Sequence, residues 1–181
     1  SGYEEAAAQG ILAGINAAQK IKNIDPLILG RDESYIGTLI DDLITKEINE
    51  PYRMLTSRSE YRLILRQDNA DMRLTPRGHE IGLINNERHL LFLTKKKMIE
   101  DDLVRLNGLR IKPDESSAKI FDQLGIENNS HAAVNLLRRP EINYSTIAEI
   151  LGNGHLSQEI MEEIENQVKY SGYIERQDQL I

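Results

Sequence analysis

The sequence predicts a mostly α-helical protein. Its composition is aliphatic and poor in aromatic residues, with no Trp and only two Phe among 181 residues, which suits helices better than an all-β sandwich. Apolar residues also recur at spacings of three and four along several segments, as on one face of a helix. The chain has no Cys, which excludes disulfides and thiolate metal sites. It is long enough to bury a core without them.

The first predicted helix covers residues 3–20 and is rich in small side chains. Glu4 and Glu5 lie in its first turn, where acidic groups complement the positive end of the helix dipole. Gly10 and Gly14 each cost about 1 kcal/mol relative to Ala inside a helix. Such glycines favour close packing against a sheet or another backbone. No strand precedes this helix, so we expect the chain to be a piece of a longer protein.

A second helix is predicted from Ser34, as its N-cap, to Thr45. Its apolar stripe comprises Ile36, Leu39, Ile40, Leu43 and Ile44. The adjacent acids Asp41 and Asp42 fall opposite this stripe, which indicates a solvated face.

Residues 51–79 are the one basic part of an acidic chain. They hold six Arg and three acidic residues, a balance of +3, whereas the whole chain carries a net charge of −7. A local concentration of arginines is typical of a site for a polyanion. Pairing of the same arginines with neighbouring carboxylates explains the composition equally well.

Within this segment, Ser57 to Glu60 has the sequence of a capping box and predicts a helix start. Arg58, Arg62 and Arg66 step by four and would share one face of that helix. A short extended piece precedes it, so any strand pair is expected near Tyr52 to Thr56. Thr75 and Pro76 predict the start of the next helix.

The remaining chain reads as a long helix over residues 86–107, followed by shorter ones. The long helix is expected to bury Leu91, Phe92, Ile99, Leu103 and Leu106. Shorter helices are predicted over 113–124, 131–138 and 144–151, and a last one follows Ser157. No stop signal ends the last helix, so we expect the chain to be truncated there as well.

No catalytic motif is present in the sequence. It lacks a glycine-rich phosphate loop, zinc-type spacing and a serine nucleophile elbow. Its histidines are scattered, at positions His79, His89, His131 and His155. The arginine face is therefore the main functional candidate, because guanidinium groups bind phosphate bidentately and Tyr61 offers a stacking surface. A helical protein-interaction module explains the pattern nearly as well.

Several stretches together resemble the MnmG/GidA family of tRNA-modifying flavoenzymes. They are GYEEAAAQG at residues 2–10, YIGTLIDDL at 35–43, EPYRM at 50–54 through RLT at 73–75, LLRRP at 136–140 and YSGYI at 170–174. The resemblance covers the whole chain and implies that it is a C-terminal part. Residues 1–33 would close the FAD-binding domain, and residues 34–181 would form a C-terminal helical domain.

The resemblance further implies an activity and partners. The family adds an aminomethyl or carboxymethylaminomethyl group to carbon 5 of wobble uridine 34 in tRNA. It uses FAD, NADH and a methylene-tetrahydrofolate, and it works as a cytoplasmic homodimer with the GTPase MnmE. The main FAD and NADH sites lie upstream in the family. This chain alone is therefore expected to be inactive and to hold neither cofactor. It has no long apolar run, so no insertion into a membrane is expected either.

The resemblance also implies three sets of site residues. Gly2, Tyr3 and Glu4 would face the edge of FAD, because a helix N-terminus donates to electron-rich groups. The tRNA contacts are expected at Arg58, Arg62, Arg66 and Arg73, with Lys95, Lys96 and Lys97 as further candidates. Gly172, Tyr173 and Ile174 would form either a partner surface or part of the core. The alternative for the whole chain is a helical protein-interaction or dimerisation module without RNA contact of its own.

Overall fold

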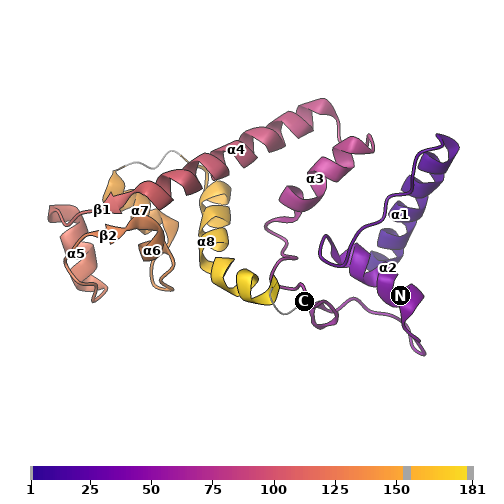
Figure 1. The fold of residues 1–181 in the computed structure, drawn as a ribbon, viewed down its shortest axis with the longest axis horizontal. Coiled ribbons are helices and arrows are strands. Elements are labelled where there is room, and N and C mark those ends of the chain that lie inside the picture. Colours follow the sequence, from indigo (N-terminus) through magenta and orange to yellow (C-terminus); the bar gives the residue numbers. More distant parts are fainter. Residues whose placement is uncertain (1, 153–155, 179–181) are drawn as a thin grey trace. The chain divides into compact units, whose positions relative to one another are not determined.

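The computed structural model describes residues 2–152 and 156–178, and these are mostly helical (Figure 1). They contain eight α-helices, one 3₁₀ turn and one pair of short strands. This confirms the predicted fold class. The chain divides into two compact units, residues 1–89 and 90–181. The predicted boundary between residues 33 and 34 concerns the domains of a longer protein and stays a prediction.

The first unit begins with two helices that pack against each other, α1 (Tyr3–Ile21) and α2 (Tyr35–Thr45). The hydroxyl of Ser34 accepts from the amide of Gly37 at 2.9 Å, which confirms the predicted N-cap. A Cβ atom on Gly37 would lie 2.1 Å from the carbonyl oxygen of Gly30. Only glycine therefore lets α2 begin so close to the preceding loop.

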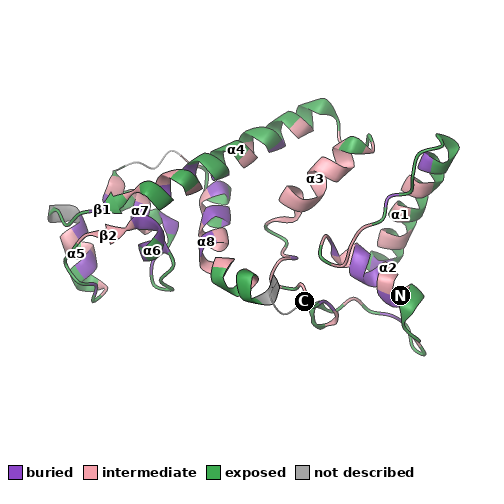
Figure 2. Ribbon diagram, in the orientation of Figure 1, coloured by how far each residue is buried: buried purple, intermediate pink, exposed green. Residues whose placement is uncertain are grey.

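The small residues of α1 face open space in the part of the chain that the structure describes. A Cβ atom on Gly10 or Gly14 would meet no described atom within 4 Å. Figure 2 shows most of α1 as exposed, with only Glu5 and Gln19 buried. The close packing that these glycines predict is therefore not made by any described residue.

The remaining elements of the first unit follow a long connection. The 3₁₀ turn η1 spans Thr56–Arg58, and α3 spans Ala70–Glu80. Helix α4 (Asn86–Gly108) begins at the end of this unit. The prediction that a helix starts at Thr75–Pro76 is wrong, because Pro76 lies inside α3. Asn69 precedes that helix as its N-cap residue, and Pro76 only removes one backbone donor within it.

The second unit consists of short elements beside α4. Strand β1 (Arg110–Ile111) pairs antiparallel with β2 (His131–Ala132). The helices are α5 (Glu115–Gln123), α6 (Ala133–Leu137), α7 (Tyr144–Leu151) and α8 (Gln158–Asp178). The strand pair therefore exists, but its predicted place near Tyr52 to Thr56 is wrong. The backbone there forms no ladder: the amide of Met54 donates to Glu5 Oε1, and the carbonyl oxygen of Leu55 accepts from the amide of Arg58 in η1.

The core of the second unit is aliphatic and includes Leu106, Phe121, Leu137, Ile147 and Ile164, all at most 1% exposed. Helix α4 contributes only part of its predicted stripe. Phe92, Ile99 and Leu106 are buried, Leu103 is intermediate, and Leu91 is 68% exposed. Leu91 precedes Phe92 by one residue, which turns it about 100° away from the buried side.

A buried polar cluster ties α4 to α7 in this unit. The hydroxyl of Tyr144 donates to Asp102 Oδ2 at 2.6 Å, and Arg105 Nε donates to Asp102 Oδ1 at 2.6 Å. The backbone amide of Tyr144 donates to Glu165 of α8 at 2.8 Å. Burial and the adjacent Asp102 raise the pKa of Tyr144 to about 12. The phenol therefore stays a donor at every physiological pH.

We predict that Tyr144→Phe lowers the free energy of unfolding by about 1–3 kcal/mol, because a buried carboxylate loses a donor. Urea denaturation followed by circular dichroism measures this. The control is Tyr173→Phe, since the Tyr173 ring is 60% exposed. Equal stability losses in the two variants would contradict the role given to the buried hydroxyl.

Candidate functional site

The segment that carries the arginines is not a helix. After the 3₁₀ turn the backbone becomes extended at Ser59, and the residues up to Asn69 form turns. The predicted capping box fails because Glu60 bonds elsewhere. Its Oε1 and Oε2 accept from Nε and Nη2 of Arg31 at 2.7 and 2.8 Å. The predicted alignment of Arg58, Arg62 and Arg66 on one helix face is therefore wrong.

Arg31 is the centre of this part of the first unit, and no motif in the sequence identified it. Besides the fork to Glu60, its Nη1 donates to Asp41 at 2.8 Å and to Asp42 at 2.7 Å. Its Nη2 also donates to the carbonyl oxygen of Arg58 at 3.2 Å. One guanidinium thus joins the loop before α2, the body of α2 and the arginine segment. Bidentate pairing fixes the angle between these pieces as well as their distance.

Asp42 is the buried end of this cluster, which corrects the prediction of a solvated Asp41–Asp42 face. Its side chain is fully buried, and its oxygens accept from Tyr52 at 2.8 Å and from Lys46 at 2.6 Å. Burial opposes its ionisation, but donation by Lys46, Arg31 and Tyr52 outweighs burial and lowers the pKa of Asp42 to about 2. The bidentate hydrogen bonds from Arg31 to Glu60 likewise lower the pKa of Glu60 to about 2.

Three of the predicted tRNA-binding arginines hold the segment together internally. Arg58 Nε donates to the carbonyl oxygen of Arg53 at 2.9 Å, and its guanidinium carbon lies 4.5 Å from the centre of the Tyr52 ring. Arg66 Nε donates to both oxygens of Asp68 at 3.1 Å. Arg73 donates to Asn69 Oδ1 and to the backbone carbonyls of Arg66 and Glu33. Of these three arginines, Arg66 pairs with a carboxylate, as the salt-bridge interpretation predicts, whereas Arg58 and Arg73 donate to backbone carbonyls and an amide oxygen.

Two cations of the segment point outward instead. Arg62 is exposed, and its side chain makes no polar contact with any residue that the structure describes. The Arg53 side chain is 65% exposed, and its Nε lies 3.4 Å from Glu5 Oε1. Arg62 is therefore the one predicted tRNA-binding arginine of this segment whose donors are available.

The predicted FAD-facing residues lie at the start of α1. Tyr3 is 94% exposed and Glu4 is exposed. Next to them the Glu5 carboxylate is buried, and Glu5 Oε1 accepts from the amide of Met54 at 2.8 Å. Hydrogen bonding from the Met54 amide, and from the backbone at Glu5 and Gly2, lowers the pKa of Glu5. A Cβ on Gly2 would lie 2.5 Å from Glu5 Oε2, so an anionic group already covers this end of the helix.

The lysine run and the C-terminal motif lie in the second unit. Lys95 pairs with Glu159 at 2.5 Å and Lys96 with Glu100 at 3.8 Å, whereas Lys97 is exposed. In α8, Tyr173 is exposed, and a Cβ on Gly172 would meet no described atom within 4 Å. This favours a surface over core packing for the motif, although Ile174 is only partly exposed. Its contact with a partner stays a prediction.

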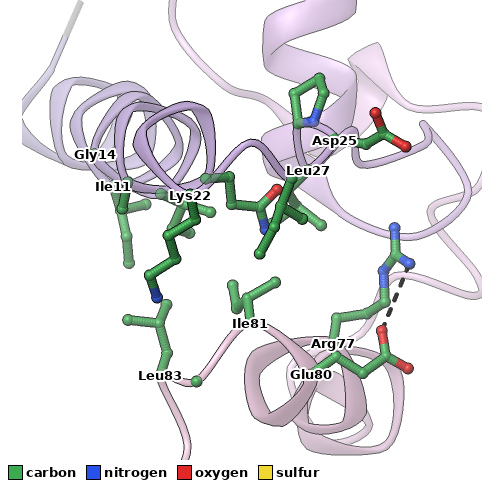
Figure 3. A pocket seen from close by; sticks show the side chains of 15 residues that line it. Ile11, Gly14, Lys22, Asp25, Leu27, Arg77, Glu80, Ile81 and Leu83 are labelled. Carbon is green, nitrogen blue, oxygen red and sulfur yellow. Dashed lines mark ion pairs between the residues drawn. The ribbon is translucent and has the colours of Figure 1, made fainter.

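A cavity of about 720 Å³ lies in the first unit, between α1 with its following loop and the end of α3. In Figure 3, Ile11 and Leu27 line one side and Ile81 lines the other, with a dashed ion pair between Arg77 and Glu80. No sequence pattern predicted this cavity. Its walls are mainly aliphatic, with Lys22, Asp25, Arg77 and Glu80 as charged members, so it offers volume chiefly for an apolar group.

The described residues contain no group of three or more His, Asp or Glu placed to hold a metal ion. The scattered histidines are partly brought together, since the rings of His79 and His89 stack at 3.8 Å between centroids. His155 lies outside the described residues. In the ranges that the structure describes, no helix combines the length and the apolar character needed to cross a membrane.

The comparisons with known proteins agree along the whole chain. Residues 86–178 match the profile of the tRNA modifying enzyme MnmG/GidA C-terminal helical domain. The chain belongs to the MnmG/GidA family. Residues 1–25 match a second profile, glucose inhibited division protein A. The family resemblance seen in the sequence is thereby confirmed.

Individual relatives give the same result. The tRNA uridine 5-carboxymethylaminomethyl modification enzyme MnmG of Listeria welshimeri is 54% identical over 97% of this chain, and that of Caldicellulosiruptor saccharolyticus is 53% identical over 100%. The crystal structure of Aquifex aeolicus GidA (form II) matches 99% of the chain with a TM-score of 0.84 and 41% identity. The chain spans 28% of the length of the Listeria relative and of the Aquifex structure.

We predict that Arg31→Gln lowers the free energy of unfolding by about 2–3 kcal/mol at pH 7, because the buried Asp42 loses one of its charged donors, keeping Lys46 and Tyr52, and Glu60 loses its bidentate partner. The control is Arg62→Gln, an exposed arginine of the same segment, which should change stability by less than about 0.5 kcal/mol.

The pH dependence gives a second measure of the same cluster. Asp42 and Glu60 have folded-state pKa values of about 2, below their values in an unfolded chain. Their stabilisation is therefore complete above about pH 5 and is lost as the pH falls toward 2. Urea melts from pH 7 to pH 2 should show a shallower loss for Arg31→Gln. Parallel curves for the variant and the parent would contradict the assignment.

Proposed function

We propose that this chain is the tRNA-binding and partner-binding C-terminal region of an enzyme that modifies wobble uridine in tRNA. The full-length enzyme would use FAD and NADH. Together with a GTPase partner and as a homodimer, it would add an aminomethyl or carboxymethylaminomethyl group to carbon 5 of uridine 34. The observation that carries the proposal is the match to the MnmG/GidA helical domain over residues 86–178.

The tRNA contact in the first unit is assigned to the outward-facing cations. Arg62 has donors available, whereas Arg58, Arg66 and Arg73 use theirs to shape the turns that present it. A free guanidinium binds a phosphate bidentately without first breaking an internal ion pair. In the second unit, the exposed Lys97 of α4 is a further cation that could meet a phosphate. The internally paired arginines and lysines would act by positioning these two.

The edge of FAD is assigned to the start of α1, as in the family. In the described chain only the exposed Tyr3 and Glu4 and the neighbouring backbone could face such a cofactor. Because the Glu5 carboxylate lies over Gly2, the contact with the flavin edge is assigned to Tyr3 and Glu4 and not to donation from the helix end itself. Bound FAD would supply the redox chemistry, and this chain would contribute one wall of its site.

A dimerisation module without RNA contact is the second candidate. The observation that favours it is the internal pairing of Arg58, Arg66 and Arg73, which removes most of the predicted RNA-binding face. The two candidates differ in one measurable property, because only the first requires the chain to bind tRNA with a salt-dependent affinity.

We predict that the chain binds a tRNA transcript and that Arg62→Gln weakens this binding about three- to tenfold. The slope of log affinity against log salt should fall by about one, as for the loss of one phosphate contact. Fluorescence anisotropy over a salt series measures both. The control is Arg88→Gln, an exposed arginine outside the basic segment whose side chain contacts no described polar group.

Two results would contradict the proposal. A parent chain that does not bind tRNA would favour the dimerisation module, which analytical ultracentrifugation would then test. Equal effects of Arg62→Gln and Arg88→Gln would leave the family assignment intact but remove Arg62 from the tRNA contact.

A further inference from the structure

One face of α8 lines a groove of about 310 Å³ in the second unit. Lys169, Gly172, Tyr173 and Arg176 are spaced by three and four residues, so they project from the same side of the helix. Arg138, the residue directly after α6, also lines this groove. The groove is thus formed by two of the motifs that the sequence singled out, LLRRP and YSGYI.

The groove is basic within an acidic chain. Among the residues that line it, three are cations and Glu175 is the one acid. Lys169 is engaged, because its Nζ donates to Glu165 at 2.8 Å. The other two are available. Arg138 is exposed and makes one long hydrogen bond, 3.5 Å to Asn135 Oδ1, and Arg176 is exposed without a polar contact to any described residue.

Shape and aromatic character complement the charge. Gly172 leaves the middle of the face open, since a Cβ there would meet no described atom within 4 Å. Tyr173 follows it directly and is exposed. Two free guanidinium groups beside an open floor and an accessible aromatic ring match a phosphate with its attached base. The groove offers no apolar anchor pocket of the kind that dominates protein interfaces.

We propose that this groove binds the tRNA backbone, with Arg138 and Arg176 on a phosphate and Tyr173 stacked on an unpaired base. The inference rests on the proposed function, because it assumes that the chain binds tRNA. It adds a second contact to the one assigned to Arg62 and gives the YSGYI motif a nucleic-acid ligand. Single-stranded RNA is the fitting class, since its bases are free to stack.

The charge test uses the double variant Arg138→Gln/Arg176→Gln in the full 181-residue chain. Anisotropy with a labelled tRNA transcript should show at least about tenfold weaker binding and a salt slope smaller by about two. The matched control is Arg139→Gln. Arg139 is also exposed, pairs with Glu141 at 3.4 Å and does not line the groove. It should change the affinity by less than about threefold.

The shape test leaves the charge unchanged. Gly172→Leu places a side chain on the open floor, where a Cβ meets no described atom within 4 Å, and should weaken tRNA binding by about tenfold, comparable to the loss of a stacked base. Gly10→Leu is its control, because Gly10 is also a helical glycine facing open space but lies on α1. Circular dichroism melts of both variants verify that they fold.

The outcomes separate the two proposals. If the parent chain does not bind tRNA, both the proposed function and the groove assignment fail. If it binds tRNA and the groove variants match their controls, the groove assignment alone is overturned. A third result also overturns it, in which the variants retain tRNA but lose a GTPase of the MnmE type in a pull-down, because the groove would then be a protein-docking surface.

Discussion

The bidentate ion pair between Arg31 and Glu60 determines how the arginine segment is built. The pair occupies the carboxylate that a capping box would need, and the segment forms turns where its sequence predicts a helix start. Arg31 instead draws Glu60 toward α2 and holds Asp41 and the buried Asp42 with its remaining donors. A contact 29 residues apart along the chain thus overrides a local signal. Local propensity often yields to tertiary contacts in this way.

The same constraint decides which cations can meet a ligand. Once the segment is folded as turns, Arg58, Arg66 and Arg73 turn inward to backbone carbonyls and to Asp68. Arg62 remains outside. A second Tyr–Asp–Arg cluster, at Tyr144, Asp102 and Arg105, fixes the second unit around α4. In both clusters the charged groups pair with each other. Unpaired arginines such as Arg62 are therefore few in a chain whose net charge is negative.

Much of the fold was predictable because its signals are local. Helix α2 ends at the predicted residue and starts after the predicted Ser34 cap, and α7 has the predicted bounds. The family followed from long, specific stretches. The turns after Ser57, the burial of Asp42 and the central place of Arg31 were not predictable, because each depends on residues distant in the sequence. Arg31 lies in a loop and belongs to no periodic pattern in the sequence. The groove on α8 includes Arg138, which is 31 residues before Lys169 in the sequence.

The central claim is that RNA contacts the unpaired arginines and not those whose guanidinium groups are bonded within the chain. Side-chain NMR of the arginine Nε–H groups tests it directly, using the ¹⁵N-labelled chain titrated with an anticodon stem-loop RNA. The account predicts shifts for Arg62, Arg138 and Arg176, and unchanged signals for Arg31, Arg66 and Arg73. Shifts confined to Arg31, Arg66 and Arg73, or no shifts at all at saturating RNA, would contradict it.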